Sequence, residues 1–153
     1  MAIKDISRKP YIEDNDDSIF IGIDLPFRKS LNKEGYFASS TTTIEAVKNN
    51  IRNLLNTNQG ERLMQPNLGT NLREHIFQQI DDETILSIQN EILDVFKVWL
   101  PFVQIRDIRV KTNNDDTTVG VNIIVLTISF NIVQDPNTLE TAVVTITNTA
   151  EQR

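Results

Sequence analysis

The sequence has no cysteine, which excludes a disulfide scaffold, thiol catalysis and zinc sites built from cysteine. It has only five glycines, and they form neither a Walker loop nor a dinucleotide-binding loop. Its single histidine, His75, lies beside Glu74 in an expected amphipathic helix, where a surface or helix-packing role is favoured over catalysis or metal binding. We therefore expect no catalytic residue, metal site or cofactor.

Long apolar runs and a basic charge balance are also missing. No stretch approaches the ~20 apolar residues that a membrane span needs, and residues 1–10 lack the apolar core of a signal peptide. The 15 Lys and Arg residues are outnumbered by 21 Asp and Glu residues, giving a net charge of -6. Nucleic acids and anionic membranes select for basic surfaces, so neither is expected as a partner.

What is present fits an ordinary globular chain. Its 153 residues, 39% of them hydrophobic, are enough to bury one core. Residues 1–17 are expected to form a mobile leader, since low apolarity and crowded acids disfavour packing. Residues 18–147 are expected to form a single domain, followed by a polar tail at 148–153. The crowded acids of the leader are Glu13, Asp14, Asp16 and Asp17.

Three helices are predicted, at about residues 42–59, 70–80 and 82–100. Thr42 and Glu45 have capping-box spacing at the start of the first helix, which Gly60 is expected to end. The third helix has Asp81 or Asp82 as its cap and Pro101 as its terminator.

After Pro101 the apolar period changes to two, which predicts a three-stranded antiparallel meander at about 103–111, 117–133 and 141–147. A phase change at Asp107–Ile108 indicates a β-bulge, and a turn is expected at 134–137. A short strand at 18–24 is an optional fourth member of the sheet. The fold class is therefore α+β, with the helices preceding the meander. The last strand is either an exposed edge or an ordinary paired strand.

Glycoside hydrolysis needs only two suitably spaced carboxylates. Glu61 would supply one of them, and Asp81 or Asp82 the other. The aspartates are better explained as helix caps, so we expect no enzyme activity.

Residues 51–77 carry a recognisable segment, IRNLLNTNQGERLMQPNLGTNLREHIF. It resembles the contractile-tail baseplate wedge family, the sheath-initiator proteins of myophages and their type VI secretion relatives. Residues 22–27 also resemble the entry segment of that family, which has carried a lysozyme-like label. The likeness covers about residues 18–147. The family motif consists of Gly60, Glu61, Arg62, Pro66 and Gly69.

The resemblance implies a structural role in the tail baseplate of a virion, assembled in the host cytoplasm. The expected partners are other baseplate wedge proteins and the tail sheath protein, with tube or hub proteins as further candidates. We hypothesise that the last strand initiates the sheath by β-strand addition, and that deletion of residues 138–153 would spare the fold. The alternatives are a tail-associated peptidoglycan hydrolase and a small adaptor unrelated to tails. The candidate sheath-contact residues are Ala142, Val143, Val144, Thr145, Ile146 and Thr147.

At the junction of the last helix and the first strand, many family members carry a Glu-Pro-Arg motif that docks onto other baseplate proteins. Here the matching stretch is Trp99, Leu100, Pro101 and Phe102, in which both charges are replaced. This candidate wedge-docking site is either an apolar interface or part of the core.

The Gly-Glu-Arg block also has a physical interpretation. Gly60 permits a positive φ, so the side chains of Glu61 and Arg62 leave the loop on different sides. We expect Glu61 to hold backbone N–H groups of the loop, and Arg62 to reach a carboxylate within the chain or on a neighbour. A loop-locking role is favoured over a partner contact.

Overall fold

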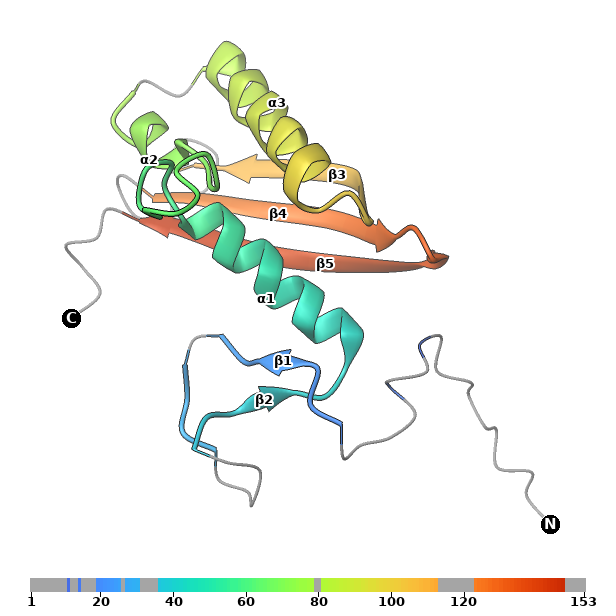
Figure 1. The fold of residues 1–153 in the computed structure, drawn as a ribbon. Helices are drawn as coiled ribbons and strands as arrows, with labels where there is room; N and C mark the ends of the chain where they lie inside the picture. Colours follow the sequence, from blue (N-terminus) through green and yellow to red (C-terminus); the bar gives the residue numbers. More distant parts are fainter. Residues whose placement is uncertain are drawn as a thin grey trace. The chain divides into compact units, whose positions relative to one another are not determined.

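The computed structural model describes residues 11, 14, 19–25, 27–30, 36–78, 81–112 and 123–147 (Figure 1). The chain divides into two compact units, residues 1–50 and 51–153, with the boundary inside helix α1 (Thr43–Asn56). Most of the expected leader and the polar tail lie outside the described residues, as do residues 113–122. In the parts that are described, no helix is long and apolar enough to cross a membrane.

The first unit contains a small hairpin of two strands, β1 (Gly22–Ile23) and β2 (Ser39–Ser40). They pair antiparallel, with Gly22 opposite Ser40. The expected strand at 18–24 therefore does not join the three-stranded sheet. Its backbone groups are already hydrogen-bonded to residues 38–40. The N–H of Ile21 donates to the carbonyl of Ser40 at 3.0 Å, and the N–H of Asp24 donates to the carbonyl of Ala38 at 3.0 Å.

The start of α1 is held by two acceptors within this unit. Thr42 Oγ1 accepts from the N–H of Glu45 at 3.3 Å, in line with the predicted cap. Asp14, which is buried, accepts from both the N–H and the hydroxyl of Thr43, at 2.8 and 2.9 Å. Further along, the buried Asn49 donates to Ser40 Oγ at 3.0 Å, which ties the helix to β2.

Helix α1 ends at Asn56, before the expected end at residue 59. The Thr57 hydroxyl donates to the carbonyl of Asn53 at 2.7 Å, and Asn56 Nδ2 donates to the carbonyl of Arg52 at 2.8 Å. Side chains thus satisfy carbonyls of the last turn, and the backbone is free to leave the helix. Gly60 is not the helix stop that the sequence suggested.

Two more helices follow, α2 (Leu72–His75) and α3 (Asp82–Trp99). α2 is shorter than the predicted 70–80 because Asn71 provides no side-chain cap and the chain turns away at Ile76. α3 begins as predicted, with Asp81 accepting from the N–H and hydroxyl of Thr84 at 2.9 and 2.7 Å.

The second unit contains an antiparallel sheet of three strands in the order β3-β4-β5. The strands are β3 (Val103–Lys111), β4 (Ile123–Ile132) and β5 (Asp135–Thr147), which confirms the predicted meander. The register shifts between Ile105 and Asp107, so the expected bulge is present one residue early. Residues 117–122 of the predicted second strand lie outside the described residues.

The turn between β4 and β5 is tighter than expected. Ile132 pairs with Asp135, so the turn is at Val133–Gln134 and β5 begins six residues before the predicted start at 141. The hairpin closes over two central residues, the commonest connection between antiparallel strands. The expected turn residues at 135–137 therefore belong to the strand.

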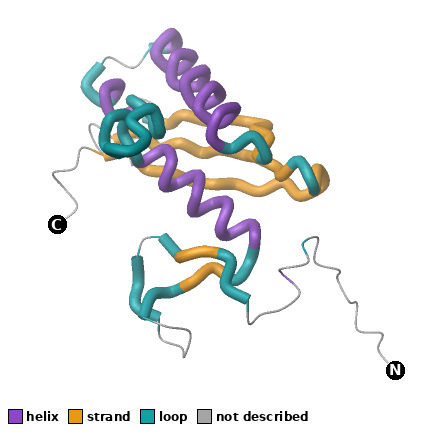
Figure 2. Tube along the Cα trace, viewed as in Figure 1, coloured by secondary structure: helices purple, strands orange, loops and turns teal. Residues whose placement is uncertain are grey.

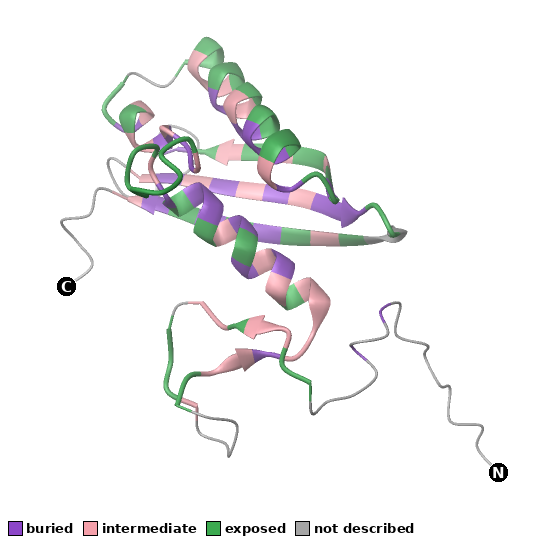
Figure 3. Cartoon of the chain, viewed as in Figure 1, coloured by how far each residue is buried: buried purple, intermediate pink, exposed green. Residues whose placement is uncertain are grey.

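The core of the second unit lies on one face of this sheet (Figures 2 and 3). Alternate side chains of β4 and β5 are buried and lie opposite each other, as Leu126 does with Val144 and Ile128 with Ala142. The helical part of the core comes from residues 51–56 of α1, from α2 and from α3, which contacts β3. Its buried helical residues are Ile51, Leu54, Leu55, Leu72, Ile88, Ile92, Val95 and Phe96.

Candidate functional site

The family motif lies in the loop that joins α1 to α2. Three consecutive β-turns build this loop, each closed by a backbone hydrogen bond. The first spans residues 58–61, with an N···O distance of 3.2 Å. The second spans 62–65 at 3.2 Å, and the third spans 65–68 at 3.1 Å.

Longer-range backbone bonds close the loop on itself. The N–H of Gly60 donates to the carbonyl of Pro66 at 2.8 Å, and the N–H of Thr70 donates to that of Thr57 at 2.9 Å. Asn58 and Thr70 form an isolated parallel bridge. The loop is therefore a hydrogen-bonded structure that brings the family-motif residues together.

Both glycines of the motif have positive φ. Gly60, at φ 88°, is the third residue of the first turn, a position that requires this conformation in a type II turn. Gly69, at φ 121°, is also closely approached by backbone, because a Cβ there would lie 2.3 Å from the carbonyl oxygen of Thr57. The sequence predicted a positive φ at Gly60 but gave no reason for Gly69.

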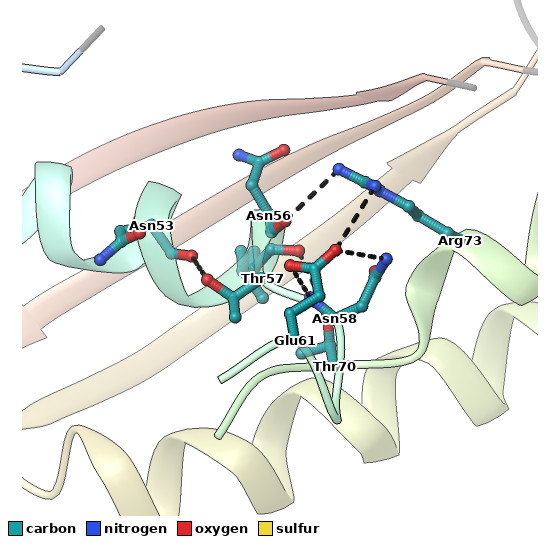
Figure 4. Close-up of polar contacts among 8 residues, drawn as sticks. Asn53, Asn56, Thr57, Asn58, Glu61, Thr70 and Arg73 are labelled. Atoms are coloured by element: carbon teal, nitrogen blue, oxygen red, sulfur yellow. Dashed lines mark hydrogen bonds and ion pairs between the residues drawn. The ribbon is translucent and has the colours of Figure 1, made fainter. Parts of the chain in front are cut away.

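Glu61 locks the loop from within (Figure 4). Its Oε2 accepts from the N–H of Asn58 at 3.0 Å, and its Oε1 from Asn58 Nδ2 at 3.0 Å. Arg73 of α2 approaches the same carboxylate at 3.9 Å and donates to the carbonyl of Asn56 at 3.5 Å. The expected contact between Glu61 and a loop N–H is thus present. Arg73 was not foreseen, because no local spacing rule links it to Glu61.

Arg62 and the next two residues are exposed. In the described ranges Arg62 forms no ion pair, so the intrachain carboxylate that we considered for it is not found there. Leu63 is 97% exposed and Met64 is 94% exposed. Sequence reasoning missed this pair, although two large apolar residues at the centre of a turn are a detectable signal.

A groove adjoins this exposed turn. It has a volume of about 530 Å³ and is bounded by the loop on one side and the last turns of α3 on the other. The charged residue in its wall, Asp94, is paired with Lys97 at 2.9 Å. Gln59, Gln65 and Asn67 also line the groove, but most of its surface is apolar. Its apolar lining consists of Met64, Pro66, Val95, Val98 and Trp99.

The junction after α3 divides between core and surface. Leu100 is only 7% exposed, and its N–H donates to the carbonyl of Phe96 at 2.9 Å. Phe102 is 40% exposed, while its carbonyl accepts from the N–H of Val133 at 3.0 Å. Trp99 is half-buried and Pro101 is exposed. Leu100 thus belongs to the core, whereas Phe102 is partly exposed.

The two edges of the three-stranded sheet differ in character. The β3 edge has a bulge at residue 106 and four charged side chains, features that discourage pairing with another strand. Residues 141–147 of β5 contain neither a charge nor a proline, and Thr141, Val143 and Thr145 are exposed between buried neighbours. Residues 141–147 of β5 therefore lack these protective features, whereas the first part of the strand contains Asp135, Pro136 and Glu140. The charged residues of β3 are Arg106, Asp107, Arg109 and Lys111.

Three of the residues considered for acid–base chemistry, Glu61, Asp81 and His75, have structural partners. The backbone N–H of Thr84 bonds the Asp81 carboxylate and lowers its pKa, as expected for a helix cap. His75 lies 3.4 Å from Glu91 and 3.2 Å from Gln78. Among the described residues, no group of three potential ligands could hold a metal ion.

The chain was compared with protein families and with solved structures. Residues 41–137 match the family model for the baseplate wedge protein gp25. A crystal structure of a protein named as a tail lysozyme from Geobacter sulfurreducens is 22% identical, with a TM-score of 0.58 over 69% of this chain and 91% of that one. A chain of the anti-feeding prophage baseplate is 21% identical, with a TM-score of 0.51 over 84% and 86%.

A chain of the postcontracted pyocin R2 baseplate is 20% identical, with a TM-score of 0.49 over 69% of this chain and 97% of that one. At such identities the structural likeness concerns the fold. No curated protein matches the sequence.

Proposed function

Because the chain belongs to the family of the baseplate wedge protein gp25, we propose that it connects a contractile-tail baseplate to the sheath and initiates sheath polymerisation. The family match covers well over half of the chain, including the motif loop, α2, α3 and most of the sheet. The chain would act in the tail baseplate of a virion, after assembly in the host cytoplasm. In this role it would bind other tail proteins and would not catalyse a reaction.

The unprotected edge of β5 carries this proposal. An edge strand has a row of backbone N–H and C=O groups with no partner strand, and an added strand can satisfy them. Proteins commonly protect such edges with charge, proline or a bulge, and β3 has charges and a bulge. Residues 141–147 have none of these, which supports β-strand addition by a sheath subunit at β5.

The side chains of β5 also limit which strand fits. Thr141, Val143 and Thr145 alternate on the exposed face, and all three are β-branched. Cross-strand pairs of β-branched side chains stabilise a sheet by about 0.2 to 1 kcal/mol each. A sheath strand with β-branched or aromatic residues facing these positions would therefore be preferred.

The expectation that residues 138–153 can be deleted without loss of the fold is wrong. Ala142, Val144 and Ile146 are buried and pair with the central strand β4. Their removal would expose the core, so a deletion cannot separate sheath contact from folding.

Substitutions at the exposed positions provide the test. We expect Val143→Lys combined with Thr145→Lys to leave the thermal midpoint within a few degrees of wild type, since both side chains are exposed. Purified particles should then contain the wedge proteins but no assembled sheath, because charged side chains at an edge oppose strand addition. Val133→Lys, an exposed substitution in the hairpin turn, is the control. Sheath of normal length on the doubly substituted protein would contradict the proposal.

We further infer that the helical side of the second unit contacts other wedge proteins, with tube or hub proteins as further candidates. Phe102 and Pro101 are the exposed members of the junction at which many family members carry their docking motif. Because the charges of that motif are absent here, the contact would be apolar.

The name of the Geobacter structure makes a peptidoglycan hydrolase the second candidate. A lysozyme-like general acid needs a carboxyl group kept protonated by an apolar setting. Glu61 is instead exposed and bonded to Asn58 and Arg73, and Asp81 is used as a helix cap. We expect neither the wild type nor Glu61→Gln to clear purified peptidoglycan. Clearing by the wild type that is lost in Glu61→Gln would favour the hydrolase.

A further inference from the structure

The tip of the motif loop, defined as Arg62, Leu63 and Met64, is an unusual surface. Leu63 and Met64 are almost completely exposed, so the chain itself gains little from their apolar side chains. Burial of such a side chain in a complex is favourable, because it removes apolar surface from water. Two adjacent large apolar residues that remain in water are therefore available to stabilise a complex.

Turn formation does not explain why these residues are present. The neighbouring turn, residues 65–68, has Pro66 and Asn67 at its centre, which are residue types that suit turns. The turn at the tip has Leu63 and Met64 in the same positions. The local backbone would accept smaller polar residues equally well, which points to a role outside the chain.

The tip is held in place before any partner binds. The bond from Gly60 to Pro66 closes the base of the loop, and Glu61 bonds Asn58 through both carboxylate oxygens. A preformed loop loses little conformational entropy on binding, so more of the contact energy remains as affinity.

Arg62 gives the tip a positive charge that can pair with a carboxylate of a partner. Its neighbour Glu61 is already bonded to Asn58 and Arg73, whereas Arg62 forms no ion pair with any described residue. A guanidinium binds a carboxylate through two parallel hydrogen bonds. The complementary surface is therefore an acidic side chain at the rim of an apolar pocket.

We propose that the tip inserts into a neighbouring protein of the baseplate wedge, with Leu63 and Met64 in an apolar pocket and Arg62 on a carboxylate of that protein. The class of partner rests on the proposed function, whereas the site itself rests on the loop. Met64 also borders the groove beside α3, so the same partner would cover Val98 and Trp99.

Site-specific cross-linking tests which protein is bound. A photo-cross-linking amino acid is placed at Leu63 in cells that assemble the whole particle, and at Leu86, an exposed position on α3, as the control. The expected product joins position 63 to one wedge protein, at a peptide that has apolar residues beside Asp or Glu. Cross-links to a second copy of this chain, or to a site without an acidic residue, would overturn the proposal. A cross-linking yield at position 63 no higher than at Leu86 would also overturn it.

Substitutions then test whether the contact matters. Arg62→Glu, and separately Leu63→Ser with Met64→Ser, should reduce recovery of that wedge protein about tenfold, as expected for hot-spot side chains. Leu86→Ser is the control, and the thermal midpoints should match that of the wild type. Unchanged recovery with both tip variants would overturn this inference but not the proposed function. If the wild-type chain recovers no baseplate protein, the proposed function fails.

Discussion

At the scale of single residues, the two glycines of the motif loop have different reasons for their positive φ. Gly60 is surrounded by open space, so Gly60→Ala adds only backbone strain and should cost about 1 kcal/mol. At Gly69 a Cβ would also collide with the carbonyl of Thr57, and Gly69→Ala should cost about 2 to 4 kcal/mol. Urea unfolding of the two variants, followed by circular dichroism, measures both values. Equal losses would show that the close approach at Gly69 can relax.

Asp81 makes the stability of α3 depend on pH. Hydrogen bonds from Thr84 lower its pKa in the folded protein, so the folded state favours the ionised carboxylate. The resulting stabilisation is present above the unfolded pKa of about 4 and is lost as the pH falls through the lower folded value. The melting temperature of Asp81→Asn, which keeps a capping side chain without the charge, should approach that of the wild type below about pH 3. A constant difference between pH 7 and pH 3 would contradict this assignment.

Individual residue roles could be predicted where a local rule applies. The caps at Thr42 and Asp81 and the contact of Glu61 with a loop N–H follow from spacing along the chain. Arg73 on Glu61 and Asp14 on Thr43 join residues 12 and 29 positions apart, and no local rule connects them.

At the scale of elements, the junction after α3 separates a core position, Leu100, from a partly exposed position, Phe102. Leu100→Ala should lower the free energy of unfolding by about 2 to 4 kcal/mol, because it opens a cavity. Phe102→Ala removes a half-exposed ring and should cost about 1 kcal/mol. Only Phe102→Ala should weaken recovery of wedge proteins at a temperature at which both variants are folded. Denaturant unfolding and co-purification distinguish the two effects, and a loss of equal size for both variants would reject the division.

The strands were predicted more closely than the short helix. Alternating apolar residues fixed β3 at 103–111, because a half-buried strand repeats every two residues. β5 begins six residues before its predicted start. The prediction missed this because the two-residue turn at Val133–Gln134 lacks the Gly or Asn that usually marks such turns. The bounds of α2 were predicted less well, because the acceptor for the N–H of Asn71 at its start is the carboxylate of Glu91, 20 residues away, and no local rule connects them.

At the scale of the whole molecule, the chain is built from two units. Asn49 bonds Ser40 within the first unit and has no role in the sheet of the second. Asn49→Leu should therefore speed amide exchange in residues 19–25 and 36–40 and leave β3, β4 and β5 unchanged. Hydrogen exchange followed by mass spectrometry measures this, with Asn67→Ala in the second unit as the reference. Faster exchange throughout the sheet would show that the units unfold together.

The division between the units leaves no mark in composition, because the boundary lies inside a continuous helix. Linkers are usually recognised as polar or glycine-rich stretches between elements, and none separates residues 50 and 51. The apolar residues of α1 form one continuous stripe, although Val47 belongs to the first unit and Ile51 to the second.

The contrast between the two edges of the sheet also bears on how many further strands one molecule could add. A sheet that is open on both sides can add copies without limit, as fibres do. Here the charges and bulge of β3 discourage pairing on one side, so under the proposed strand addition each copy would pair only through residues 141–147 of β5. Copies that meet in the absence of another partner can pair edge to edge once, after which neither has an open strand. Self-association of concentrated protein should therefore end at the dimer. For the same reason, one copy with a single pairing edge would start a polymer in only one direction.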